Sequence, residues 1–351
     1  MIKDIKGLHH VTSMAGNAVE NNLFFTQTLG LRRVKKTVNF DSPDVYHLYY
    51  GDEVGTPGSV MTYFPFGQMP KGRRGAGEVG VTEFAVPKGA LRFWKERLGN
   101  SGVTGLREES FLGESRLQFD GPDGDGFALV ESADRGRTPW TGTDVPQDAG
   151  VLGFHGARFT LRDVAATGEL LTYMGYQKEE TAGNVTRYRV EGGNAADTID
   201  LEEMPGAKPA SQGSGSVHHI AFAVENRAKQ LEVRKALLDT GYQVTPVIDR
   251  DYFWAIYFRT PGGILFEVAT NEPGFDRDED PAHLGESLKL PTRYEQQRAQ
   301  IERLLPPLGP QGNRHVDQNL PRADQSAAGE SAGKGLTDLE VLFDHEEATH
   351  D

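Results

Sequence analysis

The chain has 351 residues with a net charge of −14, contains no cysteine, and is 37% hydrophobic, which is enough apolar material for packed cores. This length favours two domains, the acidic charge argues against nucleic-acid binding, and the lack of cysteine excludes disulfides, zinc–thiolate sites and a thiol nucleophile. No apolar stretch is long enough to span a bilayer and the N-terminus lacks the apolar core of a signal peptide, so we expect a cytoplasmic protein without a membrane partner.

The first predicted strand contains a histidine pair, His9 and His10, flanked by Leu8 and Val11. A predicted amphipathic helix follows it and ends at Gly30. A glycine just past a helix end fits the left-handed backbone position that other residues adopt only with strain. Several short β-rich runs come next, so the order is strand, helix, glycine stop and further strands.

This order recurs three more times, with helix stops at Gly102, Gly175 and Gly241 at intervals of about 70 residues. Each unit is predicted to be a βαβββ module, and because one module cannot cover both faces of its sheet, modules should pair. We therefore predict an α+β fold with four βαβββ modules paired into two domains with open, mixed, barrel-like sheets. The N-terminal domain would take residues 1–138 and the C-terminal domain residues 150–290.

The strand that opens the fourth module contains a second histidine pair, His218 and His219. Side chains alternate between the two faces of a strand. His218 shares its face with bulky apolar residues, whereas His219 shares its face with Ala221, which leaves room for a metal and a substrate. His219 is therefore the better ligand, and repeat equivalence selects His10 over its neighbour in the first pair.

A lone acid, Glu267, lies in the apolar run Leu265–Val268 near the end of the fourth module. An unpaired buried carboxylate is costly, so it needs a cation or a hydrogen-bond partner. A salt bridge to Arg259 is the structural alternative. Two imidazoles and one carboxylate are the facial triad of non-haem Fe(II) proteins, and the second module, with Ala128 at the corresponding place, offers no second triad. We predict one metal per chain, bound by His10, His219 and Glu267.

The remaining parts of the chain are less informative. His47 is expected to be structural or pocket-lining, and His155 to be structural. Residues 291–306 are predicted to form a polar surface helix. Residues 307–351 are rich in Gly, Pro, Gln, Asp and Ser, and are predicted to be a disordered acidic tail.

The repeat and its His–His–Glu set resemble the vicinal oxygen chelate superfamily, and within it the ring-cleaving dioxygenases that open hydroquinones, typified by 2,6-dichlorohydroquinone 1,2-dioxygenases. The resemblance covers about residues 5–305 and is carried by residues 7–12, 46–58, 217–224 and 259–267. It implies Fe(II), with Mn(II) as an alternative, bound by the three ligands named above at a site shared by the first and fourth modules. A small aromatic substrate and O2 would be the partners, and a homo-oligomer stays an open alternative.

The resemblance also implies five residues beside the metal: His9, Thr12, His218, Arg250 and Tyr257. Tyr257 and a neutral His218 are candidates for proton transfer, and Arg250 for stabilising a developing anion. The structural alternatives are a core tyrosine and a surface arginine. For His9 and His218 the strand alternation and the resemblance disagree, since alternation places both on the packed face.

Three other functions are open on the same scaffold. A glyoxalase-type isomerase or lyase would usually need a fourth ligand, and the last strand of the first module, residues 58–65, contains no acid. A catechol extradiol dioxygenase would normally take all its ligands from the C-terminal half. A metal-free binding protein would have no need for the triad.

Overall fold

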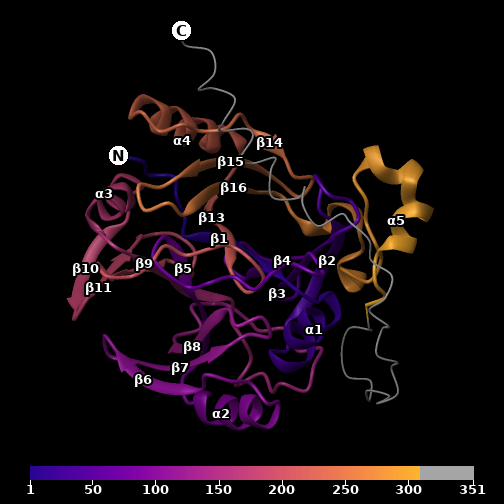
Figure 1. Cartoon of the computed structure of the whole chain (residues 1–351), viewed down its shortest axis with the longest axis horizontal. Coiled ribbons are helices and arrows are strands. Elements are labelled where there is room, and N and C mark those ends of the chain that lie inside the picture. The colour runs from indigo at the N-terminus through magenta and orange to yellow at the C-terminus, as the bar shows by residue number, and fades with distance from the viewer. Residues whose placement is uncertain (309–351) are drawn as a thin grey trace.

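The structure is a computed structural model that describes residues 1–308. It contains two eight-stranded sheets with helices packed against them (Figure 1). The tail predicted at 307–351 lies outside the described residues, except for its first two positions. No helix among residues 1–308 is long and apolar enough to cross a membrane.

All four modules have the predicted βαβββ order. Module 1 contains β1 (Leu8–Ala15), α1 (Ala18–Leu23), β2 (Arg32–Val38), β3 (Tyr46–Gly51) and β4 (Val60–Pro65), with a π-helical turn, Phe24–Thr28, extending α1. Module 2 contains β5 (Glu78–Pro87), α2 (Leu91–Asn100), β6 (Arg107–Phe111), β7 (Glu114–Asp120) and β8 (Gly126–Ser132). Module 3 contains β9 (Phe154–Leu161), α3 (Ala165–Tyr173), β10 (Gln177–Ala182), β11 (Val185–Arg189) and β12 (Thr198–Glu203). Module 4 contains β13 (Val217–Val224), α4 (Arg227–Asp239), β14 (Ile248–Asp249), β15 (Phe253–Arg259) and β16 (Leu265–Pro273).

The predicted helix stops are confirmed by the backbone. Gly30, Gly102, Gly175 and Gly241 have φ angles of +68°, +72°, +97° and +88°. This is the left-handed region, in which a Cβ atom would be strained. The period of the repeat in the sequence therefore marked real helix ends.

The sheets pair the modules in a nested order. The first sheet runs β14-β15-β16-β13-β1-β4-β3-β2 and joins modules 1 and 4, and the second runs β10-β11-β12-β9-β5-β8-β7-β6 and joins modules 2 and 3. The contacts between modules are the antiparallel pairs β1–β13 and β5–β9. The α+β fold with barrel-like sheets is thus as predicted, but the sheets do not follow the consecutive pairing implied by residues 1–138 and 150–290. Among the four strands of each module, the opening strand is at the edge, where another module can pair with it. The hydrophobic pattern of this strand does not determine which module it pairs with. The limits of independently folding domains stay a prediction.

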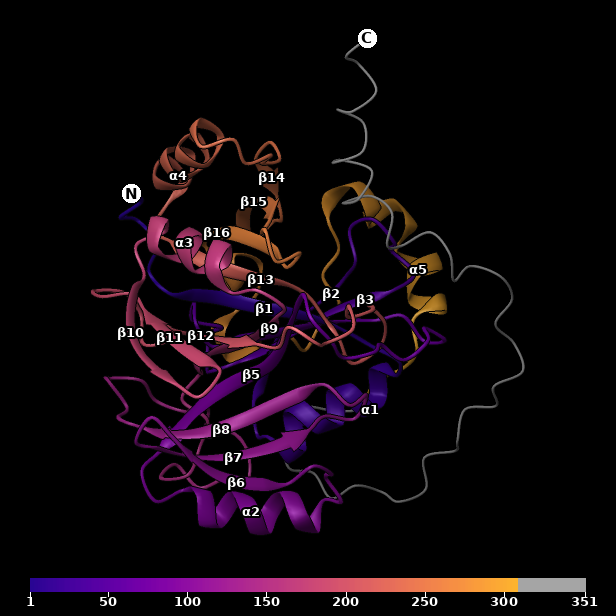
Figure 2. The same ribbon diagram turned by 60° about the vertical axis from the view of Figure 1, so that its left-hand side comes forward.

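Side chains from both sheets and from the four module helices form one continuous apolar core. Trp94 of α2 and Phe25 after α1 are fully buried in it, as are Phe222 and Phe266 of the first sheet. Figure 2 shows α2 and β6–β8 at one end of the molecule and α4 at the other. The inner face of the first sheet carries a second, smaller apolar cluster that includes Ala221, Phe253 and Ala255, whereas the inner face of the second sheet carries polar groups.

In the second sheet this inner face is filled by a buried ion-pair network. Arg116 donates to Glu83 at 2.5 Å and to Glu114 at 2.8 Å, and Arg187 grips Asp200 through two hydrogen bonds of 2.8 and 2.9 Å. Arg116, Glu83 and Asp200 have no exposed surface. Guanidinium groups therefore provide the positive charge inside this sheet.

A further buried acid links the two sheets. The hydroxyl of Tyr63, on β4, donates to the carboxylate of Asp125, which precedes β8. Burial raises the pKa of Asp125 from 3.8 to about 6. The folded protein thus holds this proton more tightly than the unfolded chain, so the contribution of this group to stability is largest below about pH 4 and is lost as pH rises through about 6.

We expect Asp125→Asn to become more stable relative to the unsubstituted protein as pH rises from 4 to 7. The change in the difference between their free energies of unfolding should be roughly 2–3 kcal/mol, because one pKa unit corresponds to about 1.4 kcal/mol. Urea unfolding of both proteins across this pH range measures it. A difference that does not vary with pH would contradict the role given to this carboxyl group.

The chain after β16 wraps along the outer strand β2. It contains 3₁₀ turns at Phe275–Asp278, Pro281–His283 and Thr292–Gln297, and the short helix α5 (Arg298–Leu304). Lys289 donates its backbone N–H to the carbonyl of Lys36 at 2.9 Å, and Figure 1 shows α5, in yellow, beside β2. The surface helix predicted at 291–306 is therefore helical over 292–304, although Ile301 is buried against the core.

Candidate metal centre

The candidate site lies on the inner face of the first sheet, in two neighbouring rows of residues that cross its strands. In one row Tyr257 of β15 lies opposite Glu267 of β16, and Glu267 lies opposite Ala221 of β13, which lies opposite His10 of β1. In the next row His219 lies opposite Thr12. The small side chain of Ala221 leaves space between the larger groups, as the strand alternation predicted.

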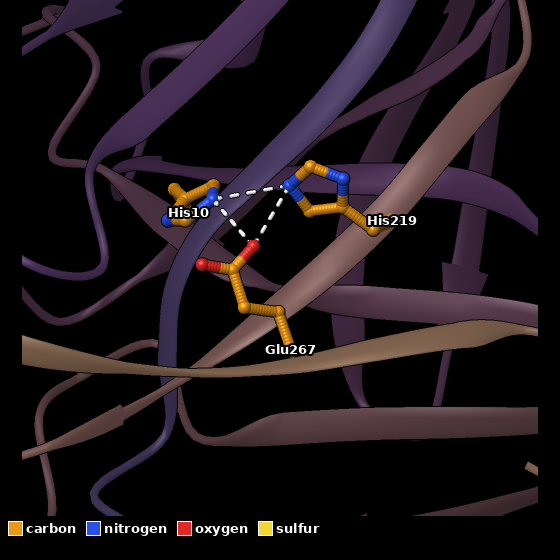
Figure 3. Close-up of side chains that lie close together, drawn as sticks. All are labelled: His10, His219 and Glu267. Atoms are coloured by element: carbon orange, nitrogen blue, oxygen red, sulfur yellow. Dashed lines mark hydrogen bonds and ion pairs between the residues drawn. The ribbon is translucent and has the colours of Figure 1, made fainter. Parts of the chain in front are cut away.

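The structure brings the three predicted ligands together, although His10 and His219 are 209 residues apart in sequence. The Nε2 atoms of His10 and His219 are 3.3 Å apart, and Glu267 Oε2 lies 3.3 Å from the first and 2.9 Å from the second. In Figure 3 the three side chains point toward one another from separate strands. All three are buried. Among residues 1–308 they are the single group of imidazole and carboxylate ligands that could hold a metal ion.

Two β-bulges explain why strand alternation failed for the other histidine of each pair. On β1, Leu8 pairs with Phe222 and His10 pairs with Ala221, the next residue of β13, so His9 is the extra residue. Further along, Thr12 pairs with His219 and Ser13 pairs with Val217, so His218 is the extra residue on β13. A bulge re-aims the side chain of its extra residue. The placement on the packed face expected from alternation is therefore wrong, and both histidines lie beside the ligands.

The first histidine pair has one consistent arrangement of protons. His9 Nε2 lies 3.1 Å from the carbonyl oxygen of Thr270, which can only accept, so His9 carries its proton on Nε2. Burial, helped by the neighbouring His10, lowers the pKa of His9 to about 3, so the ring is neutral. His9 Nδ1 must then accept from His10 Nδ1, 2.9 Å away. His10 thus presents a lone pair on Nε2 toward Glu267.

The second pair repeats this contact with one difference. His218 Nδ1 and His219 Nδ1 are 2.7 Å apart, and burial, followed by the influence of His219, lowers the pKa of His218 to about 3. If His219 donates, its Nε2 offers a lone pair and His218 carries its proton on Nε2. His218 is half-buried and lines the cavity beside the triad, whereas His9 is tied to the backbone. The two outer histidines are therefore not equivalent.

This donor set fits a divalent cation. Two imidazole lone pairs and one carboxylate oxygen converge within 4.8 Å of one another, which is repulsive unless a positive charge lies among them. Burial raises the pKa of Glu267, but positive charge at the neighbouring His10 and His219 positions outweighs burial and holds the pKa well below its usual value, as a bound cation would. The site thus keeps a charged carboxylate at its centre.

The triad forms the floor of a cavity with largely aromatic walls. Phe64, Phe66, Phe253 and Tyr49 contribute rings, and Phe253 lies 4.9 Å from the His10 ring. Polar residues complete the lining. They are Asn39, Asp41, His47, His218, Arg250 and Tyr257.

Arg250 and Tyr257, both predicted from the sequence, lie together in the cavity wall. Arg250 Nε donates to the Tyr257 hydroxyl at 3.2 Å. Burial, together with the nearby Glu267, raises the pKa of Tyr257 even though Arg250 opposes it, so this phenol is protonated at neutral pH. Arg250 is largely buried and is not the surface loop residue of the structural alternative. Tyr257, buried and with this hydrogen bond, also fits the alternative of a core tyrosine with one hydrogen bond.

Thr12, the fifth predicted residue, is buried beneath the cavity. Its hydroxyl accepts from Thr62 at 2.8 Å, and Thr62 lies 2.9 Å from His47 Nε2. The Tyr49 hydroxyl lies 2.8 Å from the other ring nitrogen of His47. Because the Thr62 hydroxyl donates its proton to Thr12, His47 donates to Thr62 from Nε2 and accepts from the Tyr49 hydroxyl at Nδ1. His47 is therefore a fixed part of the cavity wall.

Sequence reasoning missed several lining residues. Phe253 follows the same two-residue alternation as Ala255 and Tyr257 on β15, and this could have placed it in the cavity. Asn39 and Asp41 lie in the loop between β2 and β3, for which no periodic signal exists. His155, expected to be structural, lies in the second sheet, 3.3 Å from Glu114.

Comparisons with known proteins agree with this fold. Residues 7–268 match the model of the Glyoxalase/Bleomycin resistance protein/Dioxygenase superfamily. The chain is 43% identical over 308 residues to the "Putative ring-cleaving dioxygenase MhqO" of Bacillus subtilis (strain 168), covering 88% of this chain and 98% of that protein. It is 35% identical over 313 residues to the "Chlorohydroquinone/hydroquinone 1,2-dioxygenase" of Sphingobium indicum, covering 86% and 96% of the two chains.

Solved structures give the same result. A crystal structure titled as a "putative dioxygenase" from Bacillus subtilis superposes with a TM-score of 0.84 at 42% identity, covering 88% of this chain and 98% of that one. Glyoxalase I from Zea mays matches with a TM-score of 0.56 at 14% identity, covering 76% and 92% of the two chains, a likeness of fold alone. The match over most of the chain, together with these close relatives, shows that the protein belongs to the Glyoxalase/Bleomycin resistance protein/Dioxygenase superfamily.

Proposed function

We propose that the protein is an Fe(II)-dependent dioxygenase that opens the ring of hydroquinones by inserting O2 next to a hydroxylated carbon. The observation that carries the proposal is the convergence of His10, His219 and Glu267 at the floor of an aromatic-walled cavity. The relatives named as ring-cleaving dioxygenases and as a chlorohydroquinone/hydroquinone dioxygenase support the reaction and the substrate class.

His10, His219 and Glu267 would hold the metal, and three protein ligands leave positions for substrate and O2. Bound Fe(II) would supply Lewis acidity toward the substrate hydroxyl and the one-electron chemistry that a reaction with O2 requires. Mn(II) accepts the same ligands and is the alternative metal. The aromatic walls would hold the ring of the substrate and exclude water.

The chain's own residues have distinct roles in this proposal. His218, which is neutral and lines the cavity, would exchange a proton with a substrate oxygen. Arg250 would stabilise negative charge on the substrate, and its hydrogen bond would hold the Tyr257 phenol in place. His9, tied to the Thr270 carbonyl, would act only by orienting His10.

Two alternatives on the same scaffold fit less well. A glyoxalase-type isomerase would usually have a fourth ligand, and the ligand group found among residues 1–308 has three members. A catechol extradiol dioxygenase would normally take its ligands from one half of the chain, whereas here His10 comes from module 1 and the other two from module 4.

O2 consumption tests the proposal directly. Protein purified without air and reconstituted with Fe(II) is mixed with hydroquinone, in parallel with a catechol and with metal-free protein. Iron-dependent uptake with hydroquinone supports both the reaction and the substrate class. Uptake with catechol alone would change the substrate class, and no uptake with either by protein carrying stoichiometric metal would refute the dioxygenase proposal.

We expect His218→Ala to lower kcat by about 100-fold or more, the usual worth of a positioned proton-transfer group. Loss of the Nδ1 contact to His219 should also weaken metal binding by about 10-fold to 100-fold, so the assay is run at saturating Fe(II) with the metal content measured. His283→Ala, on an exposed side chain, is the matched control. Full activity of His218→Ala at equal metal content would remove His218 from the reaction.

A further inference from the structure

The mouth of the cavity carries an acid that faces the arginine in its wall. Arg250 Nη1 lies 3.8 Å from Asp41 Oδ2. Exposure increases along this wall, since the Glu267 side chain is 0% exposed, that of Arg250 16% and that of Asp41 37%. Asp41 is therefore at the rim, while the triad is at the floor.

We propose that Asp41 is a specificity-determining residue that excludes hydroquinones with an anionic ring substituent, such as a carboxylate. The proposal rests on the proposed function and adds the charge that the substrate can carry. Asp41 neutralises the guanidinium of Arg250 where a ring substituent would point outward. A substituent carboxylate would meet the Asp41 carboxylate as a like charge, which is unfavourable at close range.

Removing the Asp41 carboxylate would reverse this preference. Arg250 is held by the Tyr257 hydroxyl on one side and by Asp41 on the other. Without the Asp41 charge, its outer nitrogen would be free to form a charge-assisted hydrogen bond with a substrate carboxylate. Uncharged substituents gain nothing from the same change, so the effect is selective.

The loop that carries Asp41 is held in a defined shape. The Asp41 N–H donates to the Asn39 side-chain oxygen at 2.9 Å, and the Asn39 N–H donates to the Val45 carbonyl at 2.8 Å. The Phe40 carbonyl between them accepts two hydrogen bonds of 2.6 Å, from Arg293 Nη2 and from the Tyr294 hydroxyl. Arg293 and Tyr294 come from the chain that follows β16, so they act as positioning residues for the rim.

The test compares Asp41→Asn with the unsubstituted protein on hydroquinone and on 2,5-dihydroxybenzoate. We expect the ratio of kcat/KM for the carboxylated substrate to that for hydroquinone to rise by about tenfold. Asp44→Asn, an equal charge change in the same loop on a residue that does not line the cavity, is the matched control. An unchanged ratio in Asp41→Asn, or an equal rise in Asp44→Asn, would overturn the proposal.

The positioning residues provide a second test. In Arg293→Met/Tyr294→Phe the ratio should rise in the same direction, and amide hydrogen exchange over residues 39–45 should become faster, while Glu295→Gln leaves both unchanged. Faster exchange without a change in the ratio would contradict the role of the rim in specificity.

Failure of the proposed function is separable from failure of this inference. If the unsubstituted protein consumes no O2 with any diol, the reaction is refuted. Anaerobic calorimetry with Fe(II)-loaded protein then still measures the binding of the two compounds. A shift toward 2,5-dihydroxybenzoate in Asp41→Asn supports the inference, and an unchanged preference overturns it.

Discussion

His219→Ala is expected to lose metal binding and the proposed ring-cleaving activity together while the protein stays folded. The imidazole supplies one of three ligands, and removing even a residue that orients a ligand typically costs about 10-fold to 100-fold in metal affinity. A missing ligand should cost more than this. Glu267 would also lose its nearest partner, at 2.9 Å, so the remaining site would hold a buried carboxylate and one imidazole.

The measurements are metal content per chain after reconstitution, O2 uptake with hydroquinone, and circular dichroism as a check of the fold. Glu267→Gln provides an independent variant, because it keeps the shape of the side chain and removes its charge. His283→Ala controls for the loss of a histidine as such. A His219→Ala protein with stoichiometric iron and undiminished uptake would refute the ligand assignment.

Arg116→Met is expected to lower the free energy of unfolding by about 3–5 kcal/mol, the usual cost of removing one partner of a buried ion pair. The substitution removes the hydrogen-bonded cation of Glu83, which lies at 2.5 Å, and the longer contact to Asp200 at 3.5 Å, although Asp200 keeps its two hydrogen bonds from Arg187. Both carboxylates have no exposed surface. Methionine fills a similar volume, so the loss reports the charge rather than a cavity.

Urea unfolding, with its slope checked for each variant, measures the effect. Arg107→Met is the matched control, because that side chain is 66% exposed and its ion pair with Glu109 is long, at 3.4 Å, so its cost should be about 0.5 kcal/mol or less. Combining Arg116→Met with Glu83→Gln should recover part of the loss. A cost below about 1 kcal/mol for Arg116→Met alone would mean that water reaches this network.

Much of the site was predictable from local patterns. The spacing of the glycines at the helix ends predicted the βαβββ module. Strand alternation selected His219 over His218 as the metal ligand, because the small Ala221 shares the face of His219. What the sequence could not show is the geometry between strands that are far apart in the chain. The bulges at His9 and His218 depend on the register of β1 against β13. Asp41 lines the cavity beside Arg250, which is distant in sequence.

The nested order of the modules has a consequence for the order in which the two sheets form during synthesis. The second sheet is built from consecutive modules and can form early during synthesis, whereas the first sheet must wait for its last four strands to leave the ribosome. His10 is made near the start of the chain and meets His219 and Glu267 only then. A nascent chain therefore cannot assemble this candidate metal site until β16 has emerged, and metal loading is expected only after β1 has paired with β13.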